Sequence, residues 1–255
     1  ATKFINIVYK DTEMPTLLEV LLDPISQGLI ALYVFLMLLE LLAPARKLPH
    51  IKGWIPRALC VFVVYFLLST YQLFNLTNIN PYLSTLIAVL VFELMIYIWH
   101  RTMHNNNWLW RSFHQMHHSA ERLDTYGAFY FSPLDMIGFT FIGSLSLSLI
   151  VGLAPQAISL FLFTTMFLSI FQHSNIMTPQ WLGYIIQRPE SHSVHHSKGI
   201  HAYNYSDLPI FDIIFGTFKN PKEFEKDIGF YNGASAHIPQ MLIFRDVSRK
   251  SDASE

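Results

Sequence analysis

Two long stretches of the 255-residue chain contain no charged side chain. They cover positions 58–92 and 136–187, and are 35 and 52 residues long. Because a helix needs roughly 20 apolar residues to cross a bilayer, each stretch can hold a pair of crossings. Each also has a break where a hairpin would turn, the polar segment 75–81 in the first and Gly152-Leu153-Ala154-Pro155 in the second. The pattern therefore predicts two helical hairpins.

An earlier apolar run, residues 24–43, carries Glu40 as its only charged residue and is predicted to be an additional crossing near the N-terminus. We expect an all-α, polytopic membrane protein with four core transmembrane helices in two hairpins, one extra N-terminal span and a helical cap. Residues 1–255 are expected to form a single membrane-embedded domain. The predicted spans are 24–43, 57–74, 82–99, 137–153 and 156–171, and the predicted cap comprises about 100–135 and 172–245.

The basic residues predict how these spans are oriented. Of the 17 Lys and Arg residues, four follow the first predicted span, three follow the third and eight follow the fifth, whereas the hairpin turns contain none. Since basic loops stay on the cytoplasmic side, we expect the N-terminus outside and the cap in the cytoplasm. A bacterial inner membrane is favoured because the C-terminus carries no lysine-type retention signal, with the endoplasmic reticulum as the alternative. Two short apolar stretches, 181–186 and 208–218, are predicted to lie at the membrane interface.

Composition agrees with a membrane protein and narrows its chemistry. Only 14% of the residues are charged and 52% are hydrophobic, whereas soluble domains carry about 25% charged residues. A net charge of −1 gives no reason to expect binding to nucleic acid, which requires a basic surface. The lone Cys60 excludes a disulfide framework and a cysteine-ligated metal site.

The 12 histidines are the unusual feature, because eight of them form three tight groups beside the ends of predicted spans. The groups are His100-Arg-Thr-Met-His104, His114-Gln-Met-His117-His118 and His192-Ser-Val-His195-His196. Residues three or four apart lie near one another on a helix, so each group is expected to present its imidazoles on one face. Such groups repel when protonated and are poorly satisfied when neutral and buried, but a metal ion accepts a lone pair from each ring. Because one ion takes about four to six ligands, two metals are implied.

Several residues outside the three groups are further candidates. His173 lies at the same depth as the groups and is predicted to be a ninth ligand. Glu93 lies two helical turns before His100 and could hold an imidazole in place, or could lie near water or pair with an arginine. Asp135 and Asp212 are candidates for the same role, with capping or turn formation as the alternative, and His201 is a further candidate. His50 and His237 lie apart from the groups and are interpreted as solvated loop residues.

At this point the chain resembles a known family. The three histidine boxes resemble those of the fatty acid hydroxylase/sterol desaturase superfamily, and the resemblance runs from about residue 93 to 218. It is supported by Tyr97-Ile-Trp-His100-Arg101, by Phe113-His114-Gln-Met-His117-His118-Ser119, and by Asn204-Tyr205 followed by Phe211-Asp212-Ile-Ile-Phe215-Gly216-Thr217.

The resemblance implies an O2-dependent oxidoreductase of the monooxygenase type that hydroxylates or desaturates a sterol, fatty acyl or related lipid. It implies a di-iron centre, with Zn²⁺ able to replace iron in purified protein, and assigns no separate acid or base. The implied ligands are His100, His104, His114, His117, His118, His173, His192, His195 and His196. Met177 replaces a histidine found in part of the fatty acid hydroxylase branch, which favours the sterol desaturase-like branch.

The electrons must come from a partner, because the chain contains no G-x-G-x-x-G motif and no second redox module. We expect a cytochrome b5, ferredoxin or reductase to dock around Arg111, Arg122 and Lys198. The main alternative function is a membrane metal transporter, or a metal-binding protein without oxygenase activity, although histidines at helix ends on one side suit transport poorly. A b-type haem protein needs far fewer histidines, and a zinc protease would need an H-E-x-x-H motif, which does not occur.

Overall fold

The computed structural model describes residues 17–70, 80–150 and 155–249. All regular secondary structure in these ranges is helical, and the one β-bridge found there joins Ser197 to Ile228. The expectation of an all-α protein is therefore confirmed for the described residues.

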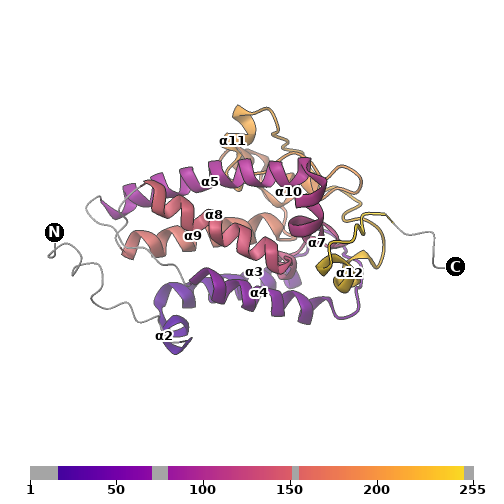
Figure 1. Cartoon of the computed structure of the whole chain (residues 1–255), viewed down its shortest axis with the longest axis horizontal. Coiled ribbons are helices and arrows are strands. Elements are labelled where there is room, and N and C mark those ends of the chain that lie inside the picture. Colours follow the sequence, from indigo (N-terminus) through magenta and orange to yellow (C-terminus); the bar gives the residue numbers. More distant parts are fainter. Residues whose placement is uncertain (1–16, 71–79, 151–154, 250–255) are drawn as a thin grey trace.

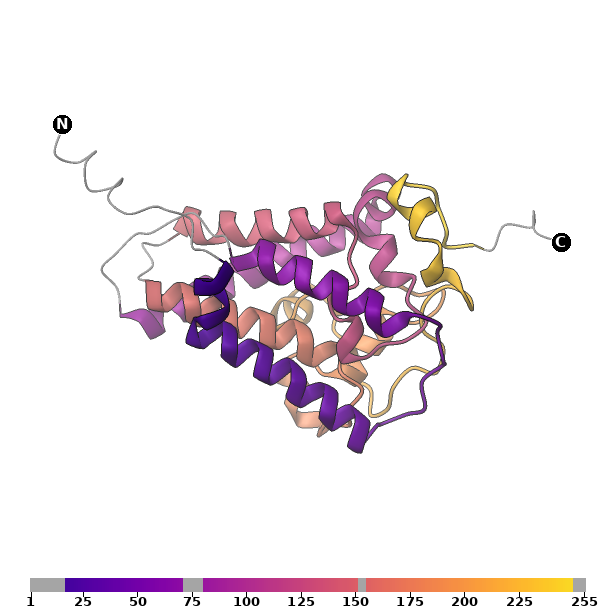
Figure 2. The same ribbon diagram turned by 90° about the horizontal axis from the view of Figure 1, so that it is seen from below.

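The described residues form five long helices, which run side by side along the molecule (Figure 1). In that view, α8 and α9 lie between α5 on one side and α3 with α4 on the other, and Figure 2 shows α3 and α4 in front of the rest. A short helix, α2 (Leu17–Leu22), precedes them. The long helices are α3 (Pro24–Leu42), α4 (Trp54–Thr70), α5 (Pro81–Asn105), α8 (Pro133–Ile150) and α9 (Pro155–His173).

These helices correspond to the five predicted spans, with differences at their ends. The predicted first hairpin turn, 75–81, lies mostly outside the described residues, and so do positions 152–154 of the second. By length and hydropathy, one described helix, Tyr82–Asn105, could cross a membrane, and shorter apolar segments occur at Ser26–Leu42, Trp54–Tyr65 and Ala157–His173.

The largest difference from the prediction is the length of α5, which continues past Trp99 to Asn105. Its first turn is capped by Asn80, whose side chain accepts hydrogen bonds from the amides of Tyr82 and Leu83. The helix stops at Asn106, whose side chain caps the next helix instead. His100 and His104 therefore lie on a continuous helix.

The cap is built from short helices, of which α7, α10 and α12 gather at one end of the bundle (Figure 1). Residues Trp110–His114 form a π-helical turn. This geometry is rare in proteins, and where it occurs it is often at a functional site. The short elements are α6 (Asn107–Leu109), η1 (Trp110–His114), α7 (Gln115–His118), η2 (Thr125–Gly127), η3 (Gln180–Tyr184), α10 (Pro189–His195), α11 (Pro209–Ile214), η4 (Ala234–Ala236) and α12 (Ile238–Leu242).

Glu40 joins α3 to the cap. Its Oε1 atom accepts hydrogen bonds from the amide and hydroxyl of Thr125, at 2.8 and 2.6 Å, and from the amide of Asn175 at 2.5 Å. The single charged residue of α3 thus connects that helix to η2 and to the segment that directly follows α9 and His173.

Candidate metal centre

The structure brings the nine histidines together in two adjacent groups. The ligand atoms within each group lie within 4.8 Å of one another. The five-His group comprises His100, His104, His114, His118 and His195, and the four-His group comprises His117, His173, His192 and His196.

The expectation that each sequence box presents its rings on one face was wrong for two of the three boxes. His114 and His118, four residues apart, share the five-His group, while His117 points to the other group. The box on α10 is divided in the opposite sense, because His192 and His196 join the four-His group and His195 does not. Residues four apart in sequence share a helix face, whereas adjacent residues point about 100° apart around the helix axis. A helix that lies between the two groups therefore supplies histidines to both.

The imidazoles are neutral where they lie. His118, His192, His195 and His196 are buried, and burial together with the neighbouring imidazoles lowers the pKa of each well below its usual value. A neutral ring has one nitrogen with a free lone pair, which is the form that binds a metal.

Hydrogen bonds to carbonyl groups point several lone pairs inward. Nδ1 of His173 lies 2.6 Å from the carbonyl oxygen of Ser169, which can only accept, so Nδ1 carries the proton and Nε2 the lone pair. That Nε2 lies 3.0 Å from the Nε2 atoms of both His117 and His192. His192 Nε2 in turn lies 3.1 Å from His196 Nε2. A cation among these four nitrogens would satisfy them all at once.

The five-His group is arranged in the same way. Nδ1 of His100 and of His195 each lie 2.7 Å from a carbonyl oxygen, of Tyr205 and Tyr203 respectively. The Nε2 atoms of His104, His118 and His195 are buried without a hydrogen-bond partner among the described residues. Buried polar atoms are rarely left unpaired, so the residues present fit a metal in each group.

Two of the four candidate supporting residues contact a histidine. Asp135 Oδ2 lies 2.8 Å from Nδ1 of His114, and Nδ1 of His201 lies 3.1 Å from Nδ1 of His118. Glu93 and Asp212 instead accept hydrogen bonds from backbone amides of residues 205–208. The carbonyl acceptors were missed by sequence reasoning, because every residue has a carbonyl group and side-chain chemistry does not reveal which one points to a ligand.

A cavity of about 40 Å³ opens on both groups. It is lined by histidines of the five-His group (His100, His114) and of the four-His group (His117, His173, His192). Its remaining walls are aromatic and aliphatic side chains together with three polar ones: Tyr65, Phe92, Ile96, Phe129, Phe131, Phe139, Ser169, Gln172 and Asp207.

Comparison with known proteins places this site in a family. The model of the fatty acid hydroxylase family matches residues 85–217, just over half of the chain, and this range includes all nine histidines. The chain belongs to the fatty acid hydroxylase family. No solved structure matches it.

The relatives of this fatty acid hydroxylase family member act on different lipids. It is 30% identical over 149 residues to sphinganine C4-monooxygenase 1 of Arabidopsis thaliana, covering 56% of this chain and 57% of the relative. It is 32% identical over 152 residues to an ornithine lipid hydroxylase of Rhizobium tropici, covering 57% and 45%. It is 27% identical over 146 residues to rat (Rattus norvegicus) cholesterol 25-hydroxylase, covering 52% and 46%. The chain spans about half the length of these curated relatives.

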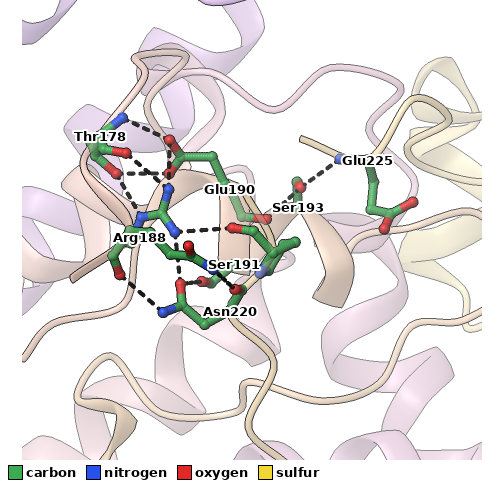
Figure 3. Close-up of polar contacts among 9 residues, drawn as sticks. Thr178, Arg188, Glu190, Ser191, Ser193, Asn220 and Glu225 are labelled. Atoms are coloured by element: carbon green, nitrogen blue, oxygen red, sulfur yellow. Dashed lines mark hydrogen bonds and ion pairs between the residues drawn. The ribbon is translucent and has the colours of Figure 1, made fainter. Parts of the chain in front are cut away.

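In this family member, a buried arginine anchors α10, which carries ligand candidates for both groups (Figure 3). Arg188 is 0% exposed, and its guanidinium makes four hydrogen bonds and one ion pair. The hydrogen-bond acceptors are the Oγ1 and carbonyl oxygens of Thr178, Asn220 Oδ1 and the carbonyl oxygen of Pro221, at 2.7–3.0 Å. The ion pair joins the guanidinium to Glu190 Oε1 at 3.0 Å.

Proposed function

We propose that this fatty acid hydroxylase family member is a membrane-bound, O2-dependent di-iron enzyme that hydroxylates or desaturates a lipid. The observation that supports the proposal most strongly is that two groups of buried, neutral imidazoles share one largely apolar cavity. Neutral imidazoles suit Fe²⁺ as well as Zn²⁺, and an oxidation that starts at a C–H bond requires the bond to reach the metals in a site that excludes water.

The ligands in this proposal are the nine histidines of the two groups. Iron bound there would supply the activation of O2 and the oxidation of the substrate. The protein supplies the position: carbonyl groups and Asp135 hold Nδ1 atoms on the outside of the site, so that Nε2 atoms face inward. No separate acid or base is assigned.

The cavity lining supports a lipid substrate. Aromatic rings from α4, α5, α8 and the segment after η2 form most of its apolar wall, and such a wall suits an alkyl or sterol carbon. Ser169, Gln172 and Asp207 form its polar side, where the Asp207 carboxylate accepts hydrogen bonds from the other two at 2.7 Å. A polar group of the substrate would lie on that side.

We further propose that residues 1–255 form one domain that crosses the membrane with α3, α4, α5, α8 and α9, with the N-terminus outside and the cap in the cytoplasm, in a bacterial inner membrane. Exposed apolar side chains on η3 and α11 favour the predicted interfacial role of these segments, because Trp181 is 64% exposed and Ile214 is 63% exposed. Contacts between α11 and the long apolar helix α5 support an interfacial position for the apolar surface of α11.

Electrons would come from a separate cytochrome b5, ferredoxin or reductase that binds the basic cap surface around Arg111, Arg122 and Lys198. Lys198 is exposed and the other two are partly exposed. Turnover of purified protein with NAD(P)H and no added carrier would contradict this part of the proposal.

The test of the function combines metal content with lipid analysis. Cells expressing the chain are compared with cells expressing His117→Ala, His195→Ala or His237→Ala, and the lipids of each are profiled for new hydroxyl groups or double bonds. We expect wild type and His237→Ala to bind two iron atoms per chain and form the same product, whereas the other two lose iron and product but keep their helical content. Equal iron in all variants, or iron without any oxidised lipid, would refute the proposal.

A further inference from the structure

The segment that follows α10 has an unusual backbone. Tyr203 and Asn204 have φ angles of +68° and +50°, and His201 has +42°. Residues other than glycine rarely adopt this left-handed conformation, and asparagine tolerates it better than tyrosine. Such conformations persist only where the surrounding structure holds them, and they are concentrated at functional sites.

This backbone directs two carbonyl groups to histidines of the five-His group. The carbonyl oxygens of Tyr203 and Tyr205 accept hydrogen bonds from Nδ1 of His195 and His100, both in the five-His group. The carbonyl of Asn204, between them, accepts instead from Gln187 Nε2 at 3.3 Å. Alternate carbonyls thus face the five-His group.

Two side chains hold the segment in this position, and Asp212 is the first. It accepts hydrogen bonds from the amides of Tyr205 and Ser206 at 2.9 and 3.0 Å, and from the Thr217 hydroxyl at 2.6 Å. Asp212 is 0% exposed, so its hydrogen bonds do not compete with water.

Asn204 provides the second anchor through both ends of its amide. Its Nδ2 donates to the carbonyl oxygens of Ser191 and Lys219 at 2.7 and 3.0 Å, and its Oδ1 accepts from the Lys219 amide at 2.8 Å. The segment is therefore held to α10 on one side and, on the other, to the chain segment that follows α11.

We infer that Asp212, together with Asn204, is a positioning residue for the five-His group. It acts through the backbone, by aiming the Tyr203 and Tyr205 carbonyls at two histidines and so fixing which nitrogen of each ring faces the metal. The four-His group receives no hydrogen bond from these two carbonyls; its His173 is anchored by the carbonyl oxygen of Ser169, on α9. The effect is therefore selective for one of the two metals. This inference rests on the proposed metal centre.

Zn²⁺ binding to the full-length, detergent-purified chain tests it, with a chelator as competitor. The variant is Asp212→Asn, which keeps the shape of the side chain but sets an NH2 group against a backbone amide. It is studied in two backgrounds: His196→Ala, which disables the four-His group, and His195→Ala, which disables the five-His group. We expect the Kd for Zn²⁺ to rise about 10–100-fold in the first background and by less than about twofold in the second.

Asp246→Asn is the matched control, because its exposed carboxylate accepts hydrogen bonds only from Ser248 among the described residues, and it should change neither Kd. Equal weakening in both backgrounds, or no weakening in either, would overturn the inference. Helical content of the metal-free proteins is measured by circular dichroism. If Asp212→Asn does not fold, Asn204→Gly, which keeps the left-handed backbone, should show the same selectivity.

Loss of helical content in both Asp212→Asn and Asn204→Gly would also overturn the inference, since these residues would then hold the fold rather than the site. Fewer than two Zn²⁺ ions bound by the wild-type chain is a separate result, which would refute the proposed two-metal centre instead.

Discussion

Replacing Arg188 with methionine tests how firmly α10 must be anchored for the site to form. The substitution removes four hydrogen bonds of a fully buried guanidinium and leaves the Glu190 carboxylate, itself 0% exposed, without its cationic partner. Removing one member of a buried ion pair costs about 3–5 kcal/mol, because the remaining charge stays desolvated. For a chain of this size each kcal/mol shifts the thermal midpoint by about 2–4 °C, so Arg188→Met should lower it by about 6–20 °C.

The double variant Arg188→Met/Glu190→Gln separates the stranded charge from the lost hydrogen bonds. The side-chain carbonyl that Glu190→Gln introduces can still accept from the Thr178 amide, as Glu190 does at 2.6 Å, so the remaining cost is that of orphaned acceptors, about 1 kcal/mol each. We expect the double variant to be about 2 kcal/mol more stable than Arg188→Met, because it no longer buries an unpaired charge. Midpoints are measured on metal-free protein with chelator present, because bound metal would stabilise the folded state by mass action.

Two results would refute this reasoning. One is a midpoint of Arg188→Met within about 2 °C of wild type, less than a 1 kcal/mol loss would produce, and the other is a double variant no more stable than the single one. Because α10 carries histidines of both groups, we also expect Arg188→Met to weaken Zn²⁺ binding at both, in contrast to Asp212→Asn.

Three further substitutions, with Gly28→Ala as a control for the first, probe packing and charge by thermal unfolding. A Cβ atom at Gly183 would lie 2.8 Å from Cδ of Arg188, so Gly183→Ala should cost about 1–3 kcal/mol, whereas Gly28→Ala, whose Cβ would lie 3.5 Å from the nearest side chain, should be neutral or stabilising. Glu40→Gln should cost about 1–3 kcal/mol, because one carboxylate oxygen accepts three hydrogen bonds; an unchanged midpoint would contradict this role. Burial raises the pKa of Asp207 from 3.8 to about 6, so between pH 3.8 and 6 the unfolded chain releases the proton first and the wild-type protein loses stability as pH rises. Asp207→Asn should remove this loss. A difference in stability between wild type and Asp207→Asn that does not change with pH would argue against it.

The long helices could be predicted because a segment that must be apolar along its whole length appears in the sequence as a long run without charged residues. Their ends could not be predicted as well, since caps depend on local hydrogen bonds. The prediction ended the third span at Trp99, but Asn106 caps the following helix and α5 continues to Asn105. The added residues carry both His100 and His104.

The types of ligand could also be predicted, whereas their supports could not. Asp135 does contact a histidine, but Glu93 and Asp212 act on the backbone of residues 205–208. A carboxylate near a histidine box in sequence has many backbone amides within reach after folding, and the pattern of residue types contains no information on which it will contact. Arg188, which belongs to a dense polar network of the cap, has no neighbour in sequence that predicts Asn220 as a partner.

The division of the boxes between the two groups explains why the site depends on the whole bundle. The five-His group takes its rings from α5, η1 with α7, and α10. The four-His group takes its rings from α7, α9, α10 and the residue that follows α10. No single box contributes enough nitrogens for one metal, and α7 and α10 each serve both groups. Because an unfolded chain has no preformed site, the free energy of metal binding would add to the free energy of folding of the bundle. Helices that are far apart in the sequence are thus joined at one point.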